Sequence, residues 1–77
     1  LYSQRMVRDE RWKYVWNATA EDELYDTIAD PGELQNLAID PQWHTERQRL
    51  RQRVLHWMQA THDPLVNFWT ERALETL

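Results

Sequence analysis

The sequence predicts an α+β fold, in which a small antiparallel sheet is covered by one long C-terminal α-helix. Residues 11–17 alternate in character, with Trp12, Tyr14 and Trp16 on one side, and this period of two is typical of a strand. Residues 41–61 contain no glycine, and no proline after the first position, and their apolar residues fall on one helical face. A length of 77 residues allows one small domain.

The first two predicted strands form a hairpin. Residues 4–8 and 11–17 both have strand character and flank the polar pair Asp9 and Glu10. Two such runs around a short polar link predict antiparallel pairing. The link lacks the glycine that a two-residue turn prefers, which favours a wider turn of four residues.

Both faces of this sheet carry apolar side chains. Trp12, Tyr14 and Trp16 share one face, and Met6 or Val7 joins Val15 on the other. The chain also has five tryptophans, three tyrosines and one phenylalanine, each with roughly 150–250 Å² to bury. We therefore expect the helix on one face and a surface outside these residues on the other. Six aromatic residues are expected to pack on the helix or on that outside surface: Trp12, Tyr14, Trp16, Tyr25, Trp43 and Trp57.

Three further elements follow the hairpin. Residues 23–26 predict a short third strand. Asp30 is an N-cap candidate followed by proline and, three residues on, by glutamate, which predicts a single helical turn over 31–36. Asp40 is again followed by proline and begins the long helix, predicted over 41–61.

The chain after this helix is harder to assign. Asp63 precedes Pro64, and a residue before proline disfavours the helical conformation. We therefore place residues 1–64 in one subdomain and residues 65–77 in a C-terminal tail. Two forms of the tail stay open: a short helix near residues 70–76, or a segment that lies over a neighbouring surface.

The side chains do not indicate catalysis or metal binding. The chain has no cysteine, and His44, His56 and His62 do not form a pair that shares a helical turn. Ser3 and the threonines lack an evident base partner. We expect no catalytic residue, no cofactor site and no metal site within these residues.

Charge and hydropathy narrow the choice of partners. The net charge of −4 argues against nucleic acid as a partner. The sequence contains no apolar run of about 18 residues, so we expect no membrane segment. A homo-oligomer stays open.

The arginines at 47, 49, 51 and 53 allow two interpretations. Arg49 and Arg53 fall on the outer face of the predicted helix, and Arg47 and Arg51 fall in or beside its apolar stripe. We favour solvated side chains whose stems cover apolar surface. The alternative is that Arg47 or Arg51 pairs with a carboxylate of the sheet or of a missing domain.

Four sequence pieces, taken in order, resemble the C-terminal end of sulfatases, the arylsulfatase-like members of the alkaline-phosphatase-type superfamily. They are RWKYVWN at 11–17, ELYD at 23–26, DPGELQNLA at 30–38 and a helix that ends near Trp57-Met58. The resemblance covers residues 5 to about 64 and rests on the combination, since each piece alone is weak. Thr27 replaces the apolar residue usual in the family, and the tail matches nothing known to us.

The resemblance implies a parent hydrolase of sulfate esters or sulfamates. Such enzymes use calcium and a formylglycine made in a Cys/Ser-x-Pro-x-Arg motif of the N-terminal domain. That motif is absent here, so no catalytic residue is carried over. The resemblance also implies a fourth strand in the sheet. These residues would then form a non-catalytic C-terminal part that braces the catalytic domain and contributes to the rim of its substrate pocket.

One alternative belongs to a different functional class. The chain would then be a free-standing interaction or oligomerisation module, which uses the aromatic sheet face formed by Trp12, Tyr14 and Trp16. The length of the natural polypeptide distinguishes the two hypotheses.

Overall fold

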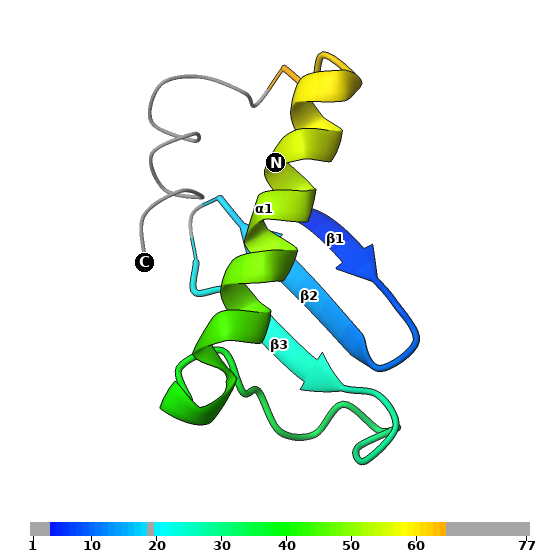
Figure 1. Cartoon of the computed structure of the whole chain (residues 1–77), viewed down its shortest axis with the longest axis vertical. Coiled ribbons are helices and arrows are strands. Elements are labelled where there is room, and N and C mark those ends of the chain that lie inside the picture. The colour runs from blue at the N-terminus through cyan, green and yellow to red at the C-terminus, as the bar shows by residue number, and fades with distance from the viewer. Residues whose placement is uncertain (1–3, 19, 65–77) are drawn as a thin grey trace.

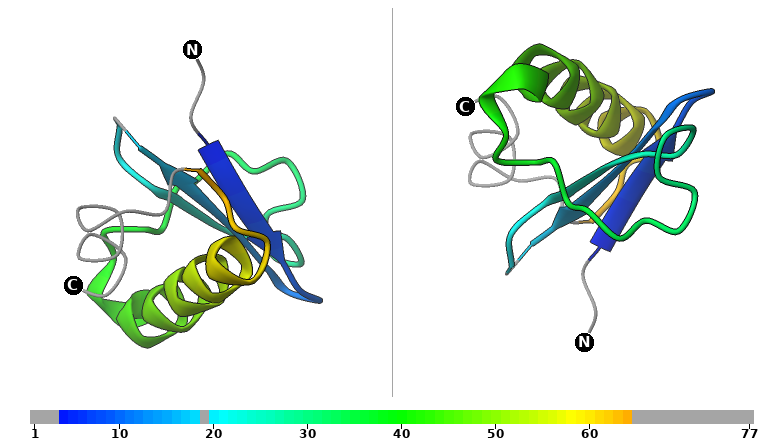
Figure 2. Two further views of the ribbon diagram at one scale, coloured as in Figure 1. Left: turned by 90° about the horizontal axis from the view of Figure 1, so that it is seen from above. Right: turned by 90° about the horizontal axis from the view of Figure 1, so that it is seen from below.

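The computed structural model describes residues 4–18 and 20–64 of the 77. Its elements, in order, are β1 (Gln4–Arg8), β2 (Trp12–Asn17), β3 (Glu23–Asp26), the 3₁₀ helix η1 (Pro41–Trp43) and α1 (His44–Ala60). The strands form one antiparallel sheet in the order β1-β2-β3. α1 crosses one face of this sheet (Figures 1 and 2). The predicted α+β fold is therefore confirmed, with three strands and one covering helix.

A carboxylate holds the turn between β1 and β2. Four residues, 9–12, separate the last paired residues of the two strands, and the backbone N–H of Asp9 donates to the carbonyl of Trp12 at 2.9 Å. Asp9 Oδ1 accepts from the backbone N–H groups of Arg11 (3.0 Å) and Trp12 (2.7 Å). Since an aspartate side chain can bond the backbone two residues further on, this turn forms without glycine.

The core lies between the sheet and α1. Alternation along β2 turns Trp12, Tyr14 and Trp16 toward the helix, and Val7 of β1 packs against the same cluster. This cluster is the main apolar burial in the described residues, and burial of this kind stabilises a fold by about 25 cal/mol per Å². Its other buried members are Leu24, Ala38, Leu50, Val54, Leu55 and Met58.

The predicted helical turn over 31–36 is wrong. These residues form a turn and an irregular segment. An N-cap side chain accepts from residues two or three positions later, whereas the Asp30 carboxylate accepts from Leu34 (3.1 Å) and Gln35 (2.9 Å), four and five positions later. Glu33 has φ 53°, a left-handed conformation that turns the chain away from a helix.

The long helix begins with a 3₁₀ turn. Asp40 Oδ1 accepts from the N–H of Gln42 at 3.0 Å, and the chain becomes α-helical only at His44. At the other end His62 is left-handed (φ 54°). The N–H of His62 bonds Gln59 O and that of Asp63 bonds Met58 O, which is the Schellman pattern of helix termination. The tail predicted over 65–77 lies outside the described residues.

Asn36 closes the outer edge of β3. Its Oδ1 accepts from the N–H groups of Leu24 (3.0 Å) and Ala38 (2.9 Å), and its Nδ2 donates to the carbonyl of Asp22 at 3.2 Å. The N–H of Leu37 then donates to the carbonyl of Leu24 at 2.8 Å. An edge strand left open invites pairing with another chain, and residues 36–38 occupy this edge. No described strand pairs with the other edge, at β1, so the fourth strand remains a prediction.

Candidate functional site

Four of the six aromatic residues singled out in the sequence lie in one layer between the sheet and the helical segment. Trp12, Tyr14 and Trp16 are 4%, 0% and 7% exposed. Trp43, from η1, packs on Trp12 with ring centroids 5.0 Å apart and planes tilted by 60°, a favourable geometry for aromatic pairs. Together these rings join the sheet to the start of the helix.

Tyr25 and Trp57 lie apart from that layer. Tyr25 faces the opposite side of the sheet, where it is opposite Lys13 in the register. Its hydroxyl donates to Glu23 Oε1 at 2.6 Å, and this hydrogen bond, together with partial burial, raises the pKa of Tyr25 to about 12. Trp57 is on α1 and stays 54% exposed. Tyr25 and Trp57 are therefore available to contact a surface outside the described residues.

Arg11 is held between two indole rings. Its guanidinium carbon lies 4.7 Å from the centroid of the Trp12 ring and 5.0 Å from that of Trp43, within the range of cation–π attraction. Its Nε and Nη2 donate to Asp26 Oδ2 at 3.1 and 2.9 Å. Asp26 also accepts from the N–H of Ala29, and these bonds lower the pKa of Asp26. The end of β3 is thereby fixed to the start of β2.

The most connected group of charges centres on Asp22, directly before β3. Arg47 donates to both of its oxygens at 2.7 and 3.1 Å, and Arg51 donates to Oδ2 at 3.1 Å. The Tyr14 hydroxyl donates to the same oxygen at 2.8 Å. The side chains of Asp22 and Arg51 are only 10% and 8% exposed. Arg47 and Arg51 therefore pair with a carboxylate beside the sheet, which was the alternative interpretation. The favoured interpretation, that these two side chains are solvated, is wrong.

The electrostatics of the Asp22 group favour a fixed protonation state. Burial raises the pKa of Asp22, but hydrogen bonds from Arg47 and Tyr14 and the two arginine charges outweigh it, so the pKa lies below its ordinary value. Burial also raises the pKa of Tyr14. A carboxylate that stays ionised and a phenol that stays protonated form a clamp between sheet and helix, and this arrangement does not supply an acid–base pair near neutral pH.

Sequence reasoning missed the role of Asp22. Asp22 and Glu23 look like solvated carboxylates beside a turn. The available signal was on the helix, where Arg47 and Arg51 are four residues apart in or beside the apolar stripe. Two arginines on the buried side of a helix require an acidic partner, because a buried charge without one is costly.

Two further carboxylates, Asp9 and Asp63, connect the strands to α1 and to the residues that follow it. At the middle of α1, Arg49 Nη2 donates to Asp9 Oδ2 at 2.8 Å, and Arg53 Nη1 lies 3.9 Å from the same oxygen. After its end, Arg5 Nε and Nη2 both donate to the Asp63 carboxylate. The first pair ties the β1–β2 turn to the helix and the second ties β1 to the helix terminus. Each pair fixes the helix direction across the sheet.

Asp30 and Asp40, singled out as caps, both bond the backbone. Asp40 caps η1, and Asp30 holds the irregular segment described above.

The described residues contain no group of three histidines, cysteines or carboxylates placed to hold a metal ion. Asp9, Asp22 and Asp26 are all engaged with arginines. Calcium therefore does not fit these carboxylates, and the Cys/Ser-x-Pro-x-Arg motif in which a formylglycine is made does not occur in the 77 residues. No described helix is long and apolar enough to cross a membrane.

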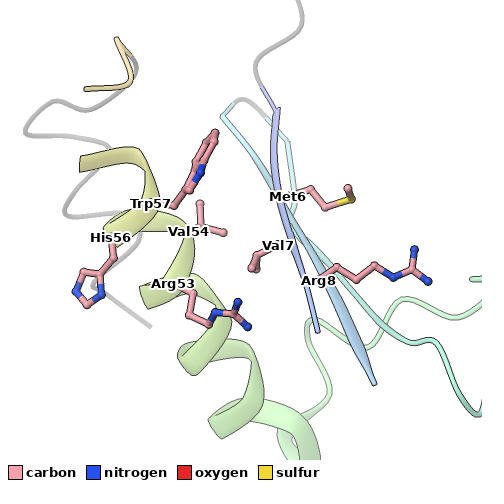
Figure 3. Close-up of a pocket in the computed structure, with 7 residues that line it drawn as sticks. All are labelled: Met6, Val7, Arg8, Arg53, Val54, His56 and Trp57. Atoms are coloured by element: carbon pink, nitrogen blue, oxygen red, sulfur yellow. The ribbon is translucent and has the colours of Figure 1, made fainter. Parts of the chain in front are cut away.

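A groove runs between β1 and α1, and we call it the edge groove. It encloses about 470 Å³ and contains two of the exposed large apolar residues, Met6 (56%) and Trp57 (54%). Figure 3 shows its seven lining residues, with Val7 and Val54 between the strand and the helix. They are Met6, Val7, Arg8, Arg53, Val54, His56 and Trp57.

Comparison of the sequence with known proteins finds similarity to sulfatases over part of the chain. No family model matches the chain. It is 36% identical to an uncharacterized protein of Haemophilus influenzae over 76 residues, which cover 99% of this chain and 39% of that protein. It is 48% identical to the N-sulphoglucosamine sulphohydrolase of Homo sapiens over 44 residues, 57% of this chain and 9% of that enzyme. It is 36% identical to the choline-sulfatase of Rhizobium meliloti over 64 residues, 78% of this chain and 12% of that enzyme. The chain is a sulfatase-like segment that spans about a tenth of the length of the sulfatases it matches.

Proposed function

We propose that these 77 residues are a non-catalytic C-terminal part of a sulfatase and that they brace its catalytic domain. One observation carries the proposal: the similarity to choline-sulfatase covers 78% of this chain but only 12% of that enzyme. The rest of such a polypeptide is the natural partner for a sheet whose second face no described helix covers (Figure 2).

The ionisable groups support a structural role. Asp22 and Asp9, which lie beside strands, pair with arginines of α1, and Asp63, three residues after α1, pairs with Arg5 of β1. A unit locked in this way keeps its outer surface in a fixed shape, which reduces the entropy cost of docking. The catalytic groups that the resemblance implies, calcium and formylglycine, would belong to the rest of the polypeptide. Hydrolysis of sulfate esters and a contribution to the substrate-pocket rim are part of this proposal.

A comparison of two purified proteins tests the proposal. The complete polypeptide that contains these residues is expected to hydrolyse an aryl sulfate, and the 77-residue chain alone is expected to show no turnover. Removal of the 77 residues is expected to lower the thermal stability of the remaining domain. Turnover by the 77-residue chain would contradict a non-catalytic role, and unchanged stability of the remaining domain would contradict bracing.

The alternative of a free-standing interaction module stays a hypothesis with a structural cost. The side chains that such a module would use, Trp12, Tyr14 and Trp16, are buried beneath α1. Binding through them would require the helix to leave the sheet and would disrupt the Asp22 group.

A further inference from the structure

The loop between β3 and η1 projects on the side of the sheet that α1 leaves uncovered. Figure 2 shows this loop, residues 27–40, extending past the sheet opposite α1 in both views. An ion pair holds it there, since Lys13 Nζ donates to Glu33 Oε1 at 2.7 Å. Lys13 alternates along β2 with Trp12 and Tyr14, which face the helix. The loop therefore extends the open face of the sheet.

Two large apolar side chains of this loop are exposed. Leu34 is 90% exposed and Ile28 is 68% exposed. In each case an aspartate holds the backbone: Asp30 Oδ1 accepts from the N–H of Leu34, and Asp26 Oδ1 accepts from the N–H of Ile28, both at 3.1 Å. Single exposed apolar residues are common on protein surfaces. Here, however, the backbone that carries each of them is fixed before any partner binds.

The backbone beside Leu34 is also strained. Glu33 has φ 53°, a left-handed conformation that is uncommon for a residue with a Cβ atom. A Cβ atom at Gly32 would lie 3.4 Å from Cγ of Leu34, so the leucine side chain lies over the one glycine of the chain. Leu34 buries little surface within the described residues, and packing there does not explain this strain. Strain of this kind clusters at functional sites.

The occupant that fits Leu34 is the rest of the polypeptide. The matched regions are only 9% and 12% of the length of two sulfatases, so most of such a chain lies outside these residues. Asp30 and Glu33 flank Leu34, and a second copy bound through the same loop would bring these carboxylates together. An apolar side chain on a fixed backbone loses little conformational entropy when it docks.

We infer that residues 30–35 form a docking anchor and that Leu34 enters an apolar pocket of the catalytic domain. Ile28 contacts the same domain beside that pocket. The inference rests on the proposed function and deepens it, because it names the residue through which this unit grips its partner. Bracing through the open sheet face alone would not need Leu34, so the anchor and the bracing role can fail separately.

Thiol labelling of Leu34→Cys in the complete polypeptide tests the burial. Labelling by a maleimide, measured by mass spectrometry of the peptide that contains position 34, is expected to be at least on the order of tenfold slower in the native than in the urea-denatured protein, since a covered site reacts only on local opening. Gln59→Cys, at an exposed position of α1, is the control and is expected to label at nearly the same rate in both states. Labelling of position 34 at the denatured rate, or equal protection at both positions, would overturn the inference.

Dilution distinguishes the catalytic domain from a second copy. A pocket in the same polypeptide is present at a high effective concentration, so the protection of position 34 is expected to survive a roughly hundredfold dilution. Protection that disappears on dilution would show that a second copy covers Leu34, and it would overturn the inference.

Truncation of the side chain tests the anchor. Leu34→Ala is expected to shorten the half-life of sulfate-ester hydrolysis near the unfolding midpoint by at least about fivefold, whereas Leu34→Met, which keeps the volume, retains it. Ile39→Ala is the matched control, since Ile39 is 85% exposed but lines a different hollow beside Trp16. Equal half-lives for Leu34→Ala and Ile39→Ala would overturn the inference. If removal of the 77 residues still destabilises the remaining domain in that case, bracing stands and only the anchor fails.

Discussion

Asp22 shows how one carboxylate fixes a helix on a sheet. It accepts hydrogen bonds from Arg47 and Arg51 of α1 and from Tyr14 of β2. A buried ion pair adds little net stability compared with apolar packing, but removal of one partner leaves a buried charge without compensation. The Asp22 group therefore contributes more to the position of α1 on the sheet than to the stability of the fold, which comes mainly from apolar burial.

Substitution of Asp22 is expected to be severe. Asp22→Asn removes the carboxylate charge that Arg47 and Arg51 both bond, and we expect the free energy of unfolding of the 77-residue chain to fall by about 3–5 kcal/mol. Urea denaturation followed by circular dichroism measures the change. Glu21→Gln, at an exposed neighbouring position, is the matched control and is expected to stay within about 0.5 kcal/mol. Equal effects of the two substitutions would show that the Asp22 group is dispensable.

Asp9 gives a prediction about acid stability. Chiefly because of its hydrogen bond from Arg49, the pKa of Asp9 falls from 3.8 to about 2 in the folded chain. A lowered folded-state pKa stabilises the fold above pH 3.8, and this contribution is lost as the pH falls from 3.8 toward 2. Asp9→Asn is therefore expected to flatten the fall of unfolding free energy over that range, measured by urea titrations at several pH values. Arg49→Gln should also flatten this fall of unfolding free energy with pH. If the fall were unchanged in both variants, the lowered pKa of Asp9 would not be its cause.

At the scale of elements, the side chain of Asn36 bonds backbone groups at the outer edge of β3 that would otherwise pair with another strand. Asn36 supplies an acceptor to Leu24 and a donor to the carbonyl of Asp22. Asn36→Ala leaves the N–H of Leu24 without that acceptor, and we expect a loss of about 1–3 kcal/mol. Faster hydrogen exchange at the Leu24 amide would accompany it. Gln35→Ala, at an exposed neighbouring position, is the control, and a Leu24 amide that stays protected in Asn36→Ala would refute this role.

Two adjacent helix residues separate core packing from docking. Met58 is fully buried, whereas Trp57 is 54% exposed. Met58→Ala is expected to cost the 77-residue chain about 2–5 kcal/mol, because a large-to-small change in a core leaves a cavity. Trp57→Ala is expected to cost less than about 1 kcal/mol in that chain. Denaturant midpoints compare the two, and a larger cost at Trp57 would place it in the core.

The elements were predictable where a strong local pattern exists. Alternation in β2 and the apolar stripe of α1 both depend on near neighbours in the sequence, and the fold class followed from them. The turn at 31–36 was not predictable in the same way, because the Asp30 carboxylate can cap a helix or hold an irregular segment. In the Asp22 group the arginines lie 25 and 29 positions from Asp22. The pattern on the helix indicates that Arg47 and Arg51 need an acidic partner, but no local pattern identifies Asp22 as that partner.

At the scale of the whole molecule, charged and apolar side chains have different roles. Charged groups connect α1 to the sheet, and several large apolar residues are left exposed to solvent. Arginine–carboxylate pairs tie α1 to the sheet along its length. Met6 and Trp57, in contrast, are exposed at the edge groove. This division fits a rigid unit that docks on a larger protein, since interface cores are enriched in tryptophan, methionine and arginine.

The central claim is that this unit braces a sulfatase catalytic domain. The most direct test is the half-life of sulfate-ester hydrolysis by the complete polypeptide, measured at a temperature near its unfolding midpoint, for Asp22→Asn against Glu21→Gln. Bracing predicts a shorter half-life for Asp22→Asn, with kcat/KM unchanged at low temperature, because the substitution weakens the support and not the chemistry. An unchanged half-life for Asp22→Asn, in a polypeptide where this unit is shown to be destabilised, would contradict the claim.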